Sequence, residues 1–195
     1  MTAGDSCAST WLGCDGANGA WLSLECSARL IAGHLWWERS AAALSGRWVA
    51  EYESPALRVW LARVASESGE AAGVWRQLMP ETHDLDPERL LADVAIRGAK
   101  IFEALESAQP GAVRLAGLVR FGLLRLISSY RRHLGVASEV ADAPVVRQLK
   151  RLLPERLETW EQGEKLLVGE MRQPEQVMSV GLHLARLEQL CLGLA

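Results

Sequence analysis

The chain has 195 residues, of which 49% are hydrophobic and 23% are charged, and its formal net charge is −3. This composition is typical of a folded globular protein and excludes a disordered chain, and the length allows one domain with a sizeable core. No cluster of Lys and Arg is present, so we expect no nucleic-acid partner. Charged residues interrupt every apolar stretch, so we expect no membrane span.

The first twenty residues lack the features of an export signal. Asp5 stands where a signal peptide has a basic residue, and no apolar segment of the required length follows it. The cysteines form no CxxC pair and have no nearby histidine at zinc-ligand spacing, so we expect free thiols in a reducing compartment at Cys7, Cys14, Cys26 and Cys191. The sequence therefore predicts a cytoplasmic protein.

Residues 1–20 are rich in small and polar residues and lack periodicity, which predicts a loose N-terminal arm before a single helical-bundle domain over 21–195. Within this domain the apolar residues recur at helical spacing, with no alternating strand pattern. Proline and glycine signals divide it into predicted helices at about 22–52, 55–79, 87–107, 112–134, 143–171 and 174–192. We expect Gly135 to end the fourth helix in left-handed backbone and Pro154 to kink the fifth. Long antiparallel helices with short loops predict an all-α bundle.

Glutamates interrupt the apolar faces of the first two predicted helices near their middles. Glu38 lies on an otherwise apolar face of the first helix, and Glu67 lies near the centre of one face of the second. If the helices form a hairpin that turns at residues 53–54, then Glu38, Glu67 and Glu70 come level within about 3 Å along the bundle axis. His34 lies one turn before Glu38 on the same side. The sequence thus predicts acids and a histidine at a common height.

A second interpretation of these polar side chains stays open. Mid-helix glutamates usually face water or pair with arginine, and Arg39, Arg63 and Arg125 are available partners. A histidine on such a face is also more often hydrogen-bonded in the core than bound to a ligand.

Eight tryptophans, against two Phe and two Tyr, form the second unusual feature of the sequence. Indoles at helical spacing usually fill a core. They can also form the walls of a pocket for a hydrophobic or aromatic ligand, and the candidates on three different helices are Trp37, Trp60 and Trp160.

The chain resembles the ferritin-like superfamily over residues 22–170. Its similarity to actinobacterial ferritin-like proteins rests on the segments HLWWERSAAALSGRWVAEYESPALRVWLARVASES, VWRQLMPE and PVVRQLKRLLPERLETWEQGEKLL. The resemblance implies a ferritin-like antiparallel four-helix bundle with one or two additional helices. Metal-using members bind two iron or manganese ions with a Glu from each of two helices and a Glu-x-x-His from each of the other two.

The metal-ligand motif of that superfamily is degenerate in this chain. Glu38 matches the first-helix Glu, but no Glu-x-x-His occurs, and the second helix has Glu67 and Glu70 where the motif would lie. We therefore expect that the metal site is lost or much altered, and that no cofactor is bound.

Three functions are consistent with these features. The first is a metal-free protein of secondary metabolism that binds a hydrophobic or aromatic small molecule in an acid-lined central pocket. There Glu38 and Glu67, tuned by His34 or Glu70, would act as general acid and base in a cyclisation, isomerisation or dehydration. The second is an iron or manganese oxidase with the same four residues as atypical ligands. The third is a non-catalytic oligomeric scaffold, such as a homodimer, that buries its tryptophans against its partner.

Overall fold

The computed structural model describes residues 22–83 and 85–193, and this part of the chain consists of helices without a strand. The prediction of an all-α fold is therefore confirmed for these residues, whereas the predicted arm over 1–20 lies outside them. The helices are α2 (Leu24–Trp48), α3 (Pro55–Leu78), α4 (Pro87–Glu106), α5 (Ala112–Ala116), α6 (Leu124–Val136), α7 (Ala143–Glu170) and α8 (Pro174–Leu192). A short 3₁₀ turn, η1 (Val49–Glu51), follows α2, and a π-helix, η2 (Gly117–Leu123), joins α5 to α6.

The helices begin where the sequence places caps and prolines. Pro55, Pro87 and Pro174 lie in the first turns of α3, α4 and α8. The Asp86 side chain accepts hydrogen bonds from the first backbone N–H groups of α4. The predicted left-handed end at Gly135 is wrong, because Gly135 stays inside α6, which runs on to Val136 before the chain becomes extended. Among the described glycines, Gly111 before α5 has the positive φ, at 93°.

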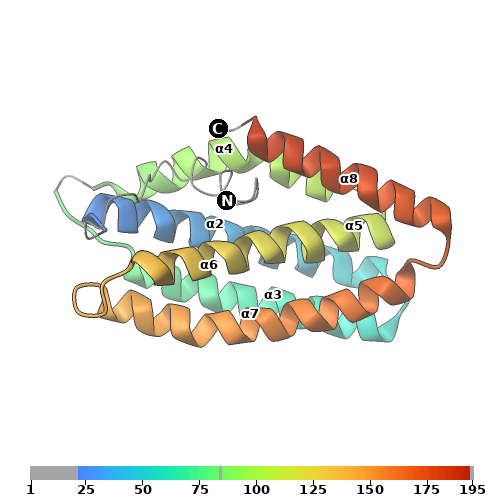
Figure 1. Cartoon of the computed structure of the whole chain (residues 1–195), viewed down its shortest axis with the longest axis horizontal. Coiled ribbons are helices and arrows are strands. Elements are labelled where there is room, and N and C mark those ends of the chain that lie inside the picture. The colour runs from blue at the N-terminus through green and yellow to red at the C-terminus, as the bar shows by residue number, and fades with distance from the viewer. Residues whose placement is uncertain (1–21, 84, 194–195) are drawn as a thin grey trace.

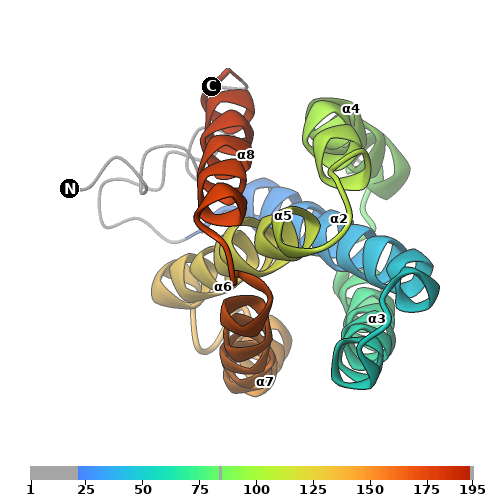
Figure 2. The same ribbon diagram turned by 90° about the vertical axis from the view of Figure 1, so that its right-hand side faces the viewer.

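The helices form three layers when the molecule is viewed end-on. Figure 2 shows α4 and α8 on one side, α2 and the α5–α6 segment in the middle, and α3 and α7 on the other side. In Figure 1 the segments α2, α3, α5–α6 and α7 follow the long axis. Because α4 returns the chain to the end where α3 began, α3 and α5–α6 run in the same direction, while α2 and α7 run in the opposite direction.

The core is apolar except at its centre. Large buried side chains such as Trp48, Trp75 and Phe121 fill the space between the layers. Among the described residues, seven polar side chains nevertheless have a relative exposure of 0%, namely His34, Glu38, Ser45, Ser68, His133, Arg156 and Thr159. Burial of so many polar groups is costly unless they bond to one another, so this centre is the first candidate for a site.

Two further expectations concern the membrane and the cysteines. No helix in the described part of the chain is long and apolar enough to cross a membrane. Cys26 is not in a disulfide, but Cys191 is disulfide-bonded, so the expectation of free thiols is wrong for Cys191.

Candidate functional site

A buried carboxylate lies between the middle layer of helices and the layer formed by α3 and α7. Glu38 on α2 has no exposed surface, and its Oε1 accepts a hydrogen bond from the Tyr130 hydroxyl of α6 at 2.6 Å. The same oxygen accepts a second bond, at 2.9 Å, from Nε of Arg156 on α7. Trp75 of α3 donates its indole N–H to the Tyr130 oxygen at 2.7 Å. Four helices therefore each contribute one side chain to a continuous set of hydrogen bonds.

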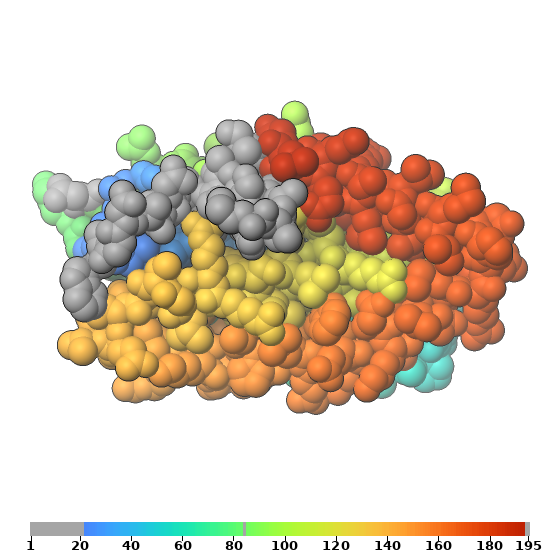
Figure 3. Space-filling view, viewed as in Figure 1, coloured from blue at the N-terminus to red at the C-terminus, as the bar shows by residue number. Residues whose placement is uncertain are grey.

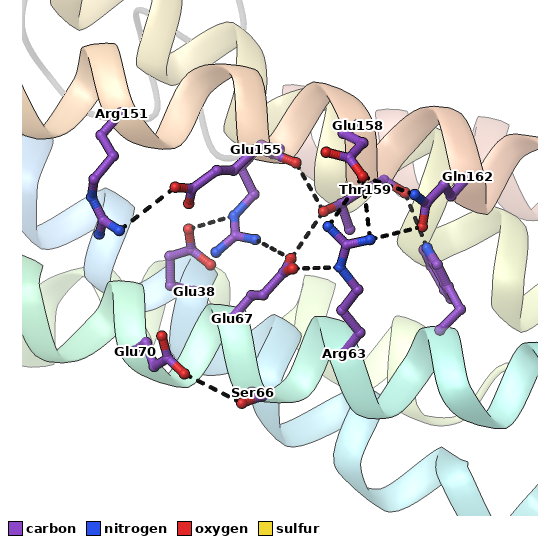
Figure 4. A network of polar contacts seen from close by, with 12 residues as sticks. Glu38, Arg63, Ser66, Glu67, Glu70, Arg151, Glu155, Glu158, Thr159 and Gln162 are labelled. Carbon is purple, nitrogen blue, oxygen red and sulfur yellow. Dashed lines mark hydrogen bonds and ion pairs between the residues drawn. The ribbon is translucent and has the colours of Figure 1, made fainter.

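Arg156 connects Glu38 to a second carboxylate nearer the surface. Its Nη1 lies 3.3 Å from Oε2 of Glu67, and the Thr159 hydroxyl lies 3.0 Å from the same oxygen. The other carboxylate oxygen of Glu67 pairs with Nε of Arg63, one turn earlier on α3. In Figure 4, Arg63 and Thr159 lie on one side of Glu67, each joined to it by a dashed line, and Glu38 lies on the other side. We call these side chains the polar network: Glu38, Arg63, Glu67, Tyr130, Arg156 and Thr159.

Burial and pairing change the pKa of the Glu38 carboxyl in opposite directions. Loss of hydration raises the pKa of the Glu38 carboxyl, the Arg156 charge and the Tyr130 hydroxyl lower it, and the net shift is upward. Burial and the adjacent Glu38 charge raise the pKa of Tyr130 well above its usual value. The phenol therefore stays protonated and donates a hydrogen bond to Glu38. The two glutamates and two arginines of the network balance in formal charge, which reduces the cost of burying them.

Four atoms at this centre are buried without a hydrogen-bond partner among the described residues: Glu38 Oε2, Ser68 Oγ, His133 Nε2 and Arg156 Nη2. Ser68 on α3 is close enough to Glu38 to help lower the pKa of its carboxyl, although neither atom has a partner with hydrogen-bond geometry. Buried polar atoms of this kind are usually bonded to ordered water. The surroundings of Glu38 are therefore better suited to water than to an apolar ligand.

Two buried histidines lie beside the network. Nε2 of His34 is 3.0 Å from Nδ1 of His133, and Nδ1 of His34 is 3.3 Å from the Ser129 hydroxyl. The rings of Trp75 and Tyr130 pack against His34, with centroids 4.9 and 4.8 Å from its own. Burial lowers the pKa of His34 well below its usual value and that of His133 to about 4. Both imidazoles are therefore neutral at pH 7 and bond to each other rather than to Glu38.

The structure brings together only part of the predicted acid cluster. Glu38 and Glu67 meet at the Arg156 guanidinium, which agrees with the common height expected from the α2–α3 hairpin. Glu70 is exposed and accepts a 3.4 Å bond from Ser66, pointing away from the network in Figure 4. The interpretation that the glutamates pair with arginine thus holds for both Glu38 and Glu67. Arg63 is a partner that the sequence offered, whereas Arg156 was not among the expected partners.

The three predicted pocket tryptophans lie in different surroundings. Trp60 is buried and donates its indole N–H to the Thr159 carbonyl at 3.0 Å. Trp37 packs in the core, with Phe121 at 6.1 Å between ring centroids. Trp160 is partly buried and packs against the edge of the core. Trp60 is the one of the three that borders the surface groove described next.

A groove of about 590 Å³ runs along the surface between α3 and α7. Its apolar lining consists of Pro55, Ala56, Val59, Trp60 and Leu166, and its polar lining of Arg63, Gln162 and Lys165. Val59 is 70% exposed, which is high for an aliphatic side chain. Arg63 belongs to both the groove and the polar network, so the groove borders the buried acids. The face formed by α6, α7 and α8 is seen in Figure 3, with part of α3 at its edge.

The residues present do not fit a pair of iron or manganese ions. No three His, Cys, Asp or Glu side chains of the described residues converge as a metal site would require. Arg156 places a positive guanidinium between Glu38 and Glu67, where a ferritin-like metal centre would need cations. Both ring nitrogens of His34 are also engaged, by His133 and Ser129. The polar network therefore has the partners of a salt bridge rather than those of a metal centre.

The arginine, tyrosine and second histidine of this centre were not predicted from the sequence. Arg156, Tyr130 and His133 lie between 92 and 118 residues from the α2 side chains that they bond. Helical spacing could have identified Arg156, because this residue lies on the buried face of α7 between Leu152 and Gly163. A basic residue on a buried face requires an acidic partner, and Glu38 was available.

Comparison of the chain with protein-family models, with curated proteins and with solved structures finds no match. Function therefore has to be argued from the geometry of the network and the groove.

Proposed function

We propose that the chain binds a small apolar molecule in the α3–α7 groove without using a metal. The observation that carries this proposal is the groove itself, whose size of about 590 Å³ lies in the range of ligand sites and whose walls are mostly apolar. A second groove of about 610 Å³, between α2 and α4, has charges of both signs in its lining, from Arg39 and Glu88. The α3–α7 groove is therefore the better match to an apolar ligand.

The ligand class is the one expected from the sequence, but its binding site lies in the surface groove and not in the centre of the bundle. A ligand in the centre of the bundle would have to reach Glu38, which has no exposed surface and is already bonded to Tyr130 and Arg156. The groove, in contrast, opens to solvent and has Trp60 as one wall. Glu67 does not line the groove, but it bonds to Arg63, which does. Any general acid–base chemistry beside the groove would therefore fall to Glu67, the network carboxylate with a 26% exposed side chain.

The order and direction of the helices support a ferritin-like topology. Ferritin-like bundles have one long crossover connection, so that two successive helices of the bundle run in parallel. Here α4 forms such a connection between α3 and α5–α6, which run in the same direction. On this proposal, the superfamily architecture is retained and an arginine takes the position of the metal. A cytoplasmic location stays a prediction, and the disulfide at Cys191 argues against a reducing compartment.

The test is binding of the neutral apolar dye Nile red, followed by its fluorescence. We expect saturable binding to the wild type and at least about tenfold weaker binding to Val59→Arg, since a charge in the groove opposes apolar burial. Val168→Arg is the matched control, because Val168 is an exposed valine of α7 that does not line the groove. Equal affinities in the two variants, or no binding to the wild type, would contradict the proposal.

A homodimeric scaffold is the second candidate, and α8 supplies the observation for it. Val177, Met178 and Leu182 are 52%, 69% and 72% exposed on this helix. Apolar side chains that cluster on a surface often mark an interface. Light scattering of the purified protein distinguishes the candidates, since a scaffold of this kind requires a mass of at least two chains.

A further inference from the structure

Lys165 is the cation of the α3–α7 groove whose charge is not used inside the protein. It is exposed and makes no hydrogen bond or ion pair with any described residue. Arg63, the other cation of the groove, donates to Glu67, Glu158 and Gln162. The two positive groups therefore differ, because most donors of Arg63 are bonded within the protein, whereas all donors of Lys165 are available to a ligand.

The groove has no carboxylate in its lining to oppose an anion. The lining side chains are apolar except for Arg63, Gln162 and Lys165. Glu67 and Glu158 lie outside the lining, and both pair with Arg63. The charge in the lining that no described residue pairs with is thus the ammonium of Lys165, which favours an anionic group on the ligand over a neutral or cationic one.

The length of the groove suits an extended hydrocarbon chain. Its α3 side extends from Pro55 to Arg63, which are eight residues apart and thus separated by about 12 Å along the helix. Val59, Trp60 and Leu166 supply apolar contact along this length. A single polar contact is enough to fix the orientation of such a ligand.

From this arrangement we infer that the ligand is an anionic amphiphile, a medium-chain carboxylate whose head group bonds to Lys165 while its hydrocarbon chain covers Val59, Trp60 and Leu166. This inference rests on the proposed function and narrows it to one chemical class. The head group would accept charge-assisted hydrogen bonds from the ammonium at the solvent edge, so that only the hydrocarbon chain needs to lose its hydration.

The experiment measures displacement of bound Nile red by three ten-carbon probes: decanoate, 1-decanol and decyltrimethylammonium. We expect decanoate to compete about five- to tenfold more strongly than 1-decanol, the range of a partly exposed charged hydrogen bond. Decyltrimethylammonium should compete least. In Lys165→Gln, decanoate should fall to the level of 1-decanol, while 1-decanol itself is unchanged. Lys150→Gln is the control, because Lys150 is also on α7 but pairs with Glu139.

The outcomes separate this inference from the proposed function. If Nile red binds in the groove but decanoate competes no better than 1-decanol, or Lys165→Gln leaves decanoate unchanged, the anionic ligand is wrong and the apolar site stands. If Nile red itself does not bind, both fail. Added salt gives an independent readout, since it should weaken competition by decanoate and not by 1-decanol.

Discussion

Arg156 is fully buried, and its guanidinium contacts two acids that come from different helices. On folding, Arg156 and Glu38 both lose their hydration, and their mutual attraction offsets this loss only while both are present. Glu67 differs, because it keeps Arg63 and some solvent contact if Arg156 is removed. At the residue scale, the stability of the network therefore depends most on the pair formed by Glu38 and Arg156.

Replacement of this arginine should be far more harmful than replacement of an exposed arginine on the same helix. We expect Arg156→Met to lower the free energy of unfolding by about 3–5 kcal/mol, since it leaves a buried carboxylate unpaired. Arg151→Met is the control and should cost at most about 1 kcal/mol, because Arg151 is half exposed and pairs with Glu155 at the surface. Urea unfolding of both variants measures the difference.

A double variant tests whether the two residues act as a pair. Glu38→Gln with Arg156→Met removes both charges, so its loss should be smaller than the sum of the single losses by more than about 1 kcal/mol. Additive losses would show that Glu38 and Arg156 contribute independently, contrary to the structure.

At the scale of helices, glycine allows indole rings to lie between neighbouring elements. A Cβ on Gly163 of α7 would be 2.5 Å from Cζ2 of Trp60 on α3, and 2.9 Å from Val119 of η2. Gly98 of α4 has the same relation to Trp36 of α2. These distances are too short for real contacts, so the helix spacing at both places depends on the absence of a side chain.

Alanine should therefore have opposite effects at two helical glycines. Gly163→Ala should destabilise by about 1–3 kcal/mol, because overpacking against Trp60 outweighs the better helix propensity of alanine. Gly73→Ala on α3 should stabilise by up to about 1 kcal/mol, since that position is exposed and has nothing within 4 Å. Thermal unfolding followed by circular dichroism gives the order of the midpoints. A Gly163→Ala protein as stable as Gly73→Ala would contradict the close approach.

The sequence predicted the elements better than it predicted their partners. Proline and cap residues placed the starts of α3, α4 and α8 correctly, since they act on neighbouring backbone groups. The π-helix at Gly117–Leu123 was not predicted, because its wider turn has no comparable local signature. Periodicity likewise showed that Glu38 faces inward but not that Arg156, 118 residues later, would meet it. Such pairings depend on which helices become neighbours, and that is decided by the whole chain.

At the scale of the whole molecule, the buried histidines determine how stability depends on pH. Burial lowers the pKa of His133 to about 4, whereas in the unfolded chain it is near the ordinary value of 6.5. Between these values the unfolded state binds a proton that the native state does not, so the free energy of unfolding falls as pH falls. The contribution of His133 is about 3 kcal/mol, fully present above pH 6.5 and lost by about pH 4. The lowered pKa of His34 acts in the same direction.

Glu38 acts in the opposite direction, since its raised pKa lets the native state bind a proton more readily and its contribution falls as pH rises. The wild type is therefore compared with a variant that lacks His133 but keeps Glu38, so that the difference between the two proteins reports the effect of the histidine on the pH dependence of stability. His133→Gln should flatten the decline of the free energy of unfolding between pH 6.5 and about 4, as measured by urea unfolding at a series of pH values. His83→Gln, in the exposed α3–α4 loop, should keep the wild-type slope. If both variants follow the wild-type slope, the buried histidine pair does not carry the acid sensitivity of the fold.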